Sequence, residues 1–77
     1  MTIQITKQID ARGLTCPMPI LKAAKAMKEL ASGEIVEVIA TDPGSVKDFA
    51  AWSRTTGHAL IESSTDGAEF RFVLRKS

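Results

Sequence analysis

Cysteine and histidine are nearly absent from this sequence of 77 residues, which has one copy of each, Cys16 and His58. A structural zinc site needs about four Cys or His ligands, a disulfide needs two cysteines, and a dithiol redox site needs a Cys-x-x-Cys pair. The sequence therefore predicts no metal site, no disulfide framework and no bound cofactor. A cysteine hydrolase is also disfavoured, because its base would have to be His58, which is predicted beyond the second helix and far from Cys16.

Long hydrophobic runs and a strong net charge are missing as well. Nothing approaches the ~20 apolar residues of a membrane-spanning helix, so no membrane partner is expected. Residues 1–4 lack the basic and apolar regions of a signal peptide, which predicts a cytoplasmic protein. A formal net charge of +1 and 5% aromatic residues argue against nucleic acid as a direct partner.

The remaining composition, 44% hydrophobic and 25% charged, is that of an ordinary globular chain. The length predicts a single domain over residues 1–77. A domain this small buries only ~60% of the surface that its unfolded chain exposes, which excludes a large enclosed active site.

Hydrophobic periodicity predicts four strands and two helices. Alternation over residues 3–10 predicts the first strand, with Lys7 as an exception on its apolar side. Pro17 and Pro19 indicate the start of a helix that ends at Ser32-Gly33. The other predicted elements are a strand over 34–40, a helix over 46–56 capped by Ser45 and stopped by Gly57, a strand over 58–65, an Asp66-Gly67 turn and a strand over 68–75.

This βαβαββ order predicts an α/β (α+β) fold, a two-layer sandwich in which two helices cover one face of a mixed four-stranded sheet. The opposite sheet face is expected to be open to solvent or to a partner. It carries Ile35, Ile39 and Val73 among polar residues. The expected inner stripes of the helices are Ile20, Ala24, Met27 and Leu30 or Ala31 in the first, and Val46, Phe49, Ala50 and Ser53 in the second.

Cys16 stands directly before the first predicted helix. Pro17 pushes the backbone of Cys16 toward the extended conformation of an N-cap. The helix dipole and nearby donors and cations are then expected to favour the thiolate, so the sequence predicts an exposed thiol with a lowered pKa. The alternative is a small core hydrophobe. The expected contributors are the N–H groups of Met18 and Ile20 and the side chains of Arg12 and Lys22.

The segment from Asp10 to Ile20, DARGLTCPMPI, resembles the signature of the TusA family of sulfur carriers, also called SirA-like, in which Arg-Gly-x-x-Cys-Pro-x-Pro opens the first helix. The likeness covers nearly the whole chain. The element order is also similar to that of the C-terminal domain of a bacterial translation initiation factor, and residues 42–48 resemble the family's second turn.

The resemblance implies that Cys16 accepts sulfane sulfur as a persulfide and passes it to another protein. The implied donor is a cysteine desulfurase or a rhodanese-like protein, and the implied acceptor is a relay protein or a sulfur-using enzyme. The chain is then a sulfurtransferase-type carrier rather than an independent enzyme, because transfer is thiolate exchange at sulfur. The supporting residues are expected to be Asp10, Arg12, Gly13, Pro17 and Pro19. Apart from the resemblance, Arg12 and Asp10 are expected to pair across the loop before Cys16 and to hold it in place.

The family's implied destinations for the sulfur are tRNA thiolation, molybdenum cofactor synthesis and sulfur oxidation. Met18 stands where some tRNA-thiolation members have an acidic residue, and the second helix has no cysteine. These departures favour another destination, such as sulfur oxidation.

Several side chains near Cys16 could contact partners. Lys22, Lys25 and Lys28 form a basic stripe that either steers an acidic partner or is merely solvated. Met18 is expected as an exposed hydrophobic contact, with folding back onto the core as the alternative. Trp52 is expected at the edge of the core, and His58 in a structural or surface role.

Two other functions stay open at this point. The same thiol could serve a redox-responsive regulatory module that is oxidised to a sulfenic acid or a mixed disulfide. The fold similarity and the lysine stripe also suggest an RNA-binding domain, although the few aromatic residues and the small net charge disfavour it.

Overall fold

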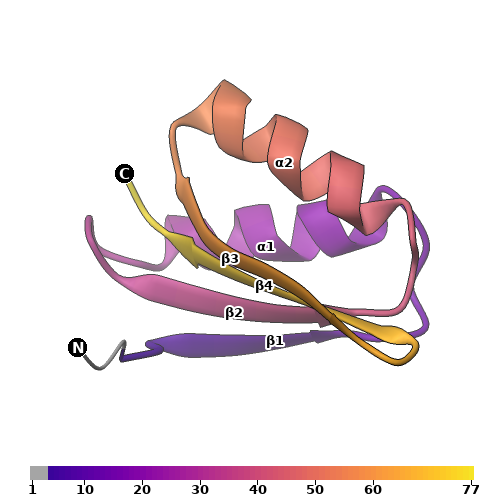
Figure 1. Ribbon diagram of the computed structural model, residues 1–77. Helices are drawn as coiled ribbons and strands as arrows, with labels where there is room; N and C mark the ends of the chain where they lie inside the picture. The colour runs from indigo at the N-terminus through magenta and orange to yellow at the C-terminus, as the bar shows by residue number, and fades with distance from the viewer. Residues whose placement is uncertain (1–3) are drawn as a thin grey trace.

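The computed structural model describes residues 4–77, and its elements follow the predicted order. Both helices lie on one face of the sheet, so the predicted two-layer architecture is confirmed (Figure 1). The elements are β1 (Lys7–Ala11), α1 (Met18–Lys28), β2 (Ile35–Ala40), α2 (Ser45–Thr56), β3 (Ala59–Asp66) and β4 (Glu69–Arg75).

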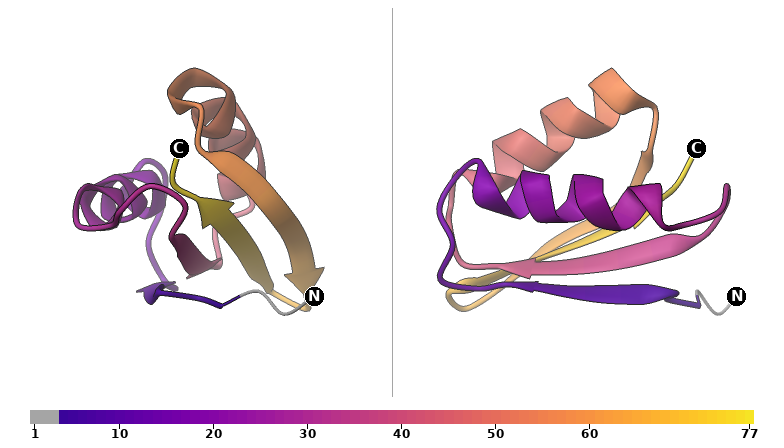
Figure 2. Two further views of the ribbon diagram at one scale, coloured as in Figure 1. Left: turned by 90° about the vertical axis from the view of Figure 1, so that its left-hand side faces the viewer. Right: turned by 180° about the vertical axis from the view of Figure 1, so that it is seen from behind.

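The sheet is mixed, with the strand order β1-β2-β4-β3. β1 pairs with β2 in parallel, and β4 pairs antiparallel with β2 on one side and with β3 on the other. β4, the last strand in the sequence, therefore lies between β2 and β3, the two strands that α2 connects. Figure 2 shows the two helices side by side above this sheet.

The two crossovers place two loops at one end of the molecule. β1 and β2 run in the same direction and end in register at Ala11 and Ala40. α1 and α2 both begin at that end and run back over the sheet (Figures 1 and 2). The loop before α1, residues 12–17, therefore lies beside the loop before α2, residues 41–44.

Phe49 lies at the centre of the core. Its ring is fully buried, stacks on Phe72 with the ring centroids 4.4 Å apart, and meets Trp52 edge to face at 6.1 Å. Such aromatic pairs add to the free energy gained from burying their apolar area. The other buried hydrophobic residues packed here are Ala11, Ala23, Ala26, Met27, Leu30, Val36, Val38, Ala40 and Leu74.

Each helix buries a stripe that matches the predicted one only in part, at Met27 of α1 and at Phe49 of α2. In α1, Ile20 and Ala24 are only half-buried, and the buried residues are Pro19, Ala23, Ala26 and Met27. Pro19 thus packs in the core, whereas the sequence indicated only that it starts the helix. In α2, Ser45 and Phe49 are buried, whereas Val46 is 39% exposed.

Three predicted boundaries were wrong. α1 ends at Lys28, because residues 29–34 form a separate turn in which the Glu34 side chain accepts the Ala31 N–H at 2.6 Å. Ser45 does not cap α2: it is the first helical residue, its buried hydroxyl has no partner, and Gly44 precedes it as N-cap. The first strand begins at Lys7, where its pairing with β2 starts, and the predicted Ile3 lies outside the described residues.

The sheet face away from the helices carries a polar network at its centre. Glu37 of β2 accepts a hydrogen bond from Gln8 of β1 at 2.9 Å and pairs with Arg71 of β4, which also pairs with Glu62 of β3. Val73 lies in register between Glu37 and Glu62 and is only 2% exposed. The expectation that Val73 is open to solvent was therefore wrong, although Ile35 and Ile39 on the same face are half-exposed.

We expect Phe49→Ala to destabilise the protein by ~3–5 kcal/mol, because it empties the centre of the core. That is a large part of the ~4–12 kcal/mol available to a domain of this length. Urea denaturation followed by circular dichroism measures the change. Ile61→Ala, at a 40% exposed residue of β3, serves as the control and should change the free energy of unfolding by less than about 0.5 kcal/mol. Equal effects of the two variants would contradict this account of the core.

Candidate functional site

Cys16 is exposed and free, and it lies in the loop that joins β1 to α1. Its exposure decides between the two sequence-based interpretations: the side chain is not a core hydrophobe. The sulfur can therefore be reached by a reactive group on another molecule.

The backbone of this loop is held by the neighbouring loop before α2. Thr41 Oγ1 accepts the Gly13 N–H at 2.9 Å, and Asp42 Oδ2 accepts the Cys16 N–H at 2.8 Å. The other carboxylate oxygen of Asp42 accepts the N–H of Gly44 at 3.2 Å. Gly13 has a φ of +79°, a backbone conformation that side chains other than glycine rarely adopt. One carboxylate thus ties together the two loops that precede the helices.

The predicted pair between Arg12 and Asp10 is confirmed. Arg12 Nε donates to Asp10 Oδ1 at 3.0 Å, and Arg12 Nη1 reaches Glu69 Oε2 at 3.3 Å. The hydrogen bond from Arg12 lowers the pKa of the Asp10 carboxyl. Since both partners of this pair are exposed, it fixes the start of the loop more than it adds to stability.

The predicted N-cap role of Cys16 was wrong. α1 begins at Met18 with Pro17 as its N-cap, and no side chain caps the helix. The Met18 N–H, expected to face the sulfur, donates instead to the Thr15 carbonyl at 2.8 Å.

The predicted lowering of the Cys16 pKa was wrong as well. A hydrogen bond with the Asp48 carboxylate is the largest cause that raises the pKa of the Cys16 thiol, followed by desolvation and by the charges of Asp48 and Asp42. Neither Arg12 nor Lys22 contributes to this shift. The dipole of α1 acts through partial charges, whereas Asp48 and Asp42 carry full negative charges that act on the sulfur, so the neutral thiol is favoured.

Asp42 and Asp48 are the site residues that the sequence-based reasoning missed. They lie more than 25 residues beyond Cys16, and the sequence-based reasoning did not connect their turn with the cysteine. A usable signal was present, because loops that follow two adjacent parallel strands meet at one edge of a sheet.

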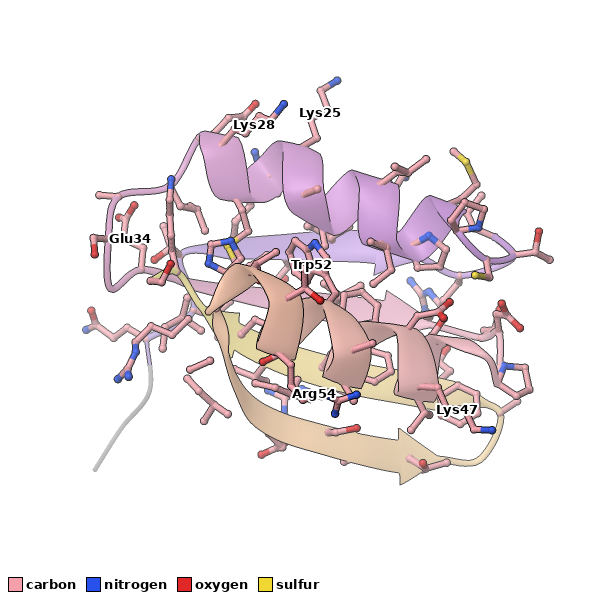
Figure 3. All side chains as sticks on the ribbon, turned by 90° about the horizontal axis from the view of Figure 1, so that it is seen from above. Lys25, Lys28, Glu34, Lys47, Trp52 and Arg54 are labelled. Atoms are coloured by element: carbon pink, nitrogen blue, oxygen red, sulfur yellow. The ribbon has the colours of Figure 1, made fainter. Side chains whose placement is uncertain are left out.

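The lysine stripe divides into two kinds of residue. Lys22 Nζ donates to the Asp10 carbonyl at 3.2 Å and so ties α1 to the end of β1. Lys25 and Lys28 point away from α2 (Figure 3). Lys22 and Lys25 also line a groove of about 410 Å³ between β1 and α1, whose lining does not include Cys16.

Met18 is 44% exposed, so its expected exposure is confirmed and its folding back onto the core is not observed. Trp52 is half-buried and packs against the core, as predicted for an edge residue. His58 lies beyond the end of α2, next to Trp52, and its Nδ1 accepts the Ser77 N–H at 3.1 Å. Desolvation lowers the pKa of His58. The structural role expected for this histidine is confirmed.

Within residues 4–77, no group of three or more His, Cys, Asp or Glu side chains is placed to hold a metal ion. None of the helices formed by those residues is long and apolar enough to cross a membrane.

Comparison with known proteins identifies related sequences and a matching family model. The family model described as "Sulfurtransferase TusA" matches residues 7–76. The chain is 51% identical to the sulfur carrier protein TusA of Allochromatium vinosum, over 92% of this chain and 93% of that protein. It is 50% identical to the putative sulfur carrier protein YrkI of Bacillus subtilis, over 91% and 93% of the two chains.

A solved structure agrees with these relatives. The crystal structure of a SirA-like protein from Desulfitobacterium hafniense matches with a TM-score of 0.81 and 26% identity, over 91% of this chain and 96% of that one. Sulfur carriers of this family take sulfur from a donor protein and deliver it to an acceptor protein. The chain belongs to the TusA family and is a sulfur carrier protein.

Proposed function

We propose that Cys16 is the residue on which this carrier holds sulfur, as a persulfide. The observation that carries the proposal is the exposed thiol on a loop whose backbone is fixed by Asp42. Cys16 is the only cysteine of the chain, so a persulfide there cannot be discharged by an internal disulfide. The sulfur then stays in place until an acceptor protein attacks it.

The proposed donor is a cysteine desulfurase or a rhodanese-like protein, and the proposed acceptor is a relay protein or a sulfur-using enzyme. Sulfur oxidation is the destination that Met18 favours, since it stands where some tRNA-thiolation members have an acidic residue. The proposed location is the cytoplasm, the compartment in which free thiols stay reduced. Residues 1–77 are proposed to act as one carrier domain.

Incubation with a cysteine desulfurase and free cysteine should add one sulfur atom to the protein, and a reductant should remove it. Cys16→Ser should gain no sulfur, because the attacking thiol is gone. Intact-mass spectrometry measures both results. A sulfur adduct on Cys16→Ser would contradict the assignment of the site.

The same experiment separates the other two functions. Absence of any adduct from desulfurase and rhodanese-like donors, together with a sulfenic acid after mild peroxide, would favour the redox-responsive module. RNA binding that persists in Cys16→Ser and weakens steeply with salt would favour the RNA-binding domain.

The hold of Asp42 on the loop can be tested by hydrogen exchange. In Asp42→Ala the Cys16 amide loses its charged acceptor, so its protection should fall by about ten-fold, the range of one charge-assisted hydrogen bond. Amide exchange measured by NMR gives the result. The Leu21 amide, which donates to the Pro17 carbonyl at 3.1 Å, is the internal control and should keep its protection. Unchanged exchange at Cys16 would show that the loop is held by other contacts.

A further inference from the structure

A pocket lies between the two helices at the end of the molecule opposite Cys16. Its volume is about 240 Å³, and it is lined by Ala24, Met27, Lys28, Trp52, Thr56, His58 and Lys76. Trp52 lies between the two helices when the molecule is seen from above (Figure 3). The two loops at the Cys16 end contribute nothing to this lining. Since α1 has 11 residues, its two ends are roughly 15 Å apart, and the pocket is separate from the sulfur.

The walls of the pocket are apolar and its size is small. Met27 is 2% exposed, whereas Ala24 and Trp52 are half-buried, so part of their apolar surface stays open. Cavities that take a drug-sized ligand have volumes of about 300–1,000 Å³. A pocket of about 240 Å³ instead fits one apolar side chain of another protein.

The polar groups that line the pocket all suit an anion. Lys76 Nζ donates to the Leu30 carbonyl at 2.6 Å, and neither Lys76 nor Lys28 forms an ion pair with any of residues 4–77. The Nδ1 atom of His58 accepts the Ser77 N–H, so the ring carries its proton on Nε2, and that N–H has no acceptor among the described residues. No carboxylate lines the pocket.

The wider surroundings keep this end of the molecule positive. Both helices end here, and each helix end carries a partial charge of about −0.5. The last helical turns contain the basic residues Lys25, Lys28 and Arg54, which offset these partial charges. The nearby carboxylate of Glu29 is paired with Lys7. An acidic partner surface is therefore attracted to this end.

We propose that the pocket is a docking site that takes one Leu or Phe side chain from an acidic segment of a partner protein. The apolar side chain enters beside Trp52, and the carboxylates next to it in the partner contact Lys76 and the Nε2 N–H of His58, with Lys28 adding positive charge. Apolar walls combined with cationic and donor groups select this occupant. Because the pocket lies apart from Cys16, a partner stays bound here while the sulfur remains exposed.

Binding of a short peptide tests the site, because Trp52 is the only tryptophan of the chain. The probe is acetyl-Glu-Asp-Leu-Phe-Asp-Glu-amide. It should change the Trp52 fluorescence in a saturable way, with a Kd of about 0.1–1 mM, the weak affinity expected of one anchoring side chain and a few exposed charges. The same peptide with Ser in place of Leu and Phe, or with Lys in place of the acidic residues, should not bind.

Variants of the carrier separate the pocket from other surfaces. Ala24→Leu fills the pocket and should weaken binding by about ten-fold or more. Lys28→Gln combined with Lys76→Gln leaves the walls in place and should weaken it by about two- to five-fold, the range of exposed ion pairs. Lys47→Gln, the same change in the first half of α2, and Cys16→Ser should bind as the wild type does. Circular dichroism checks that each variant is folded.

Amide chemical shifts measured by NMR locate the bound peptide. The shifts should change at the lining residues and stay unchanged in residues 12–17 and 41–44. Changes confined to those loops, equal binding by Ala24→Leu, binding of the Lys-containing peptide, or no saturable change up to about 5 mM peptide would overturn the proposal. Sulfur uptake by Cys16 has no part in these measurements, so this proposal and the persulfide assignment can fail separately.

Discussion

The site depends on the carboxylate of Asp42, which accepts backbone N–H groups from both loops at one end of the molecule. The fold makes this contact possible, because the parallel pairing of β1 with β2 ends both strands at the same edge, and each strand leads into a helix on the same face. The resulting hydrogen bonds fix the backbone of an exposed cysteine without enclosing it. An exposed sulfur on a rigid loop suits a protein that exchanges sulfur with other proteins rather than with a small substrate.

The electrostatic environment of Cys16 distinguishes this site from that of a cysteine enzyme. A cysteine hydrolase keeps its thiolate ready with an adjacent base, whereas here two carboxylates favour the neutral thiol. A neutral thiol is less prone to oxidation while the carrier is empty.

Stability and function use different parts of the chain. The stacked rings of Phe49 and Phe72, together with the aliphatic side chains of α1, β2 and β4, form the core on the helix-covered side of the sheet. The site lies at the end of that core. Pro19 links the core and the site. Its ring is buried in the core, and the residue before it, Met18, is exposed near Cys16.

The sequence by itself determined the element order, the two-layer fold and the position of Cys16 directly before the first helix, because alternation, helical periodicity and turn residues are local signals. It also determined the pair of Arg12 with Asp10, which are two residues apart. Only the tertiary structure decided which charges act on the thiol: local reasoning counted the dipole of α1 and the nearby cations, but Asp42 and Asp48 come from the other crossover. Their influence falls off with distance in space and not along the chain, so no pattern local to Cys16 could reveal it.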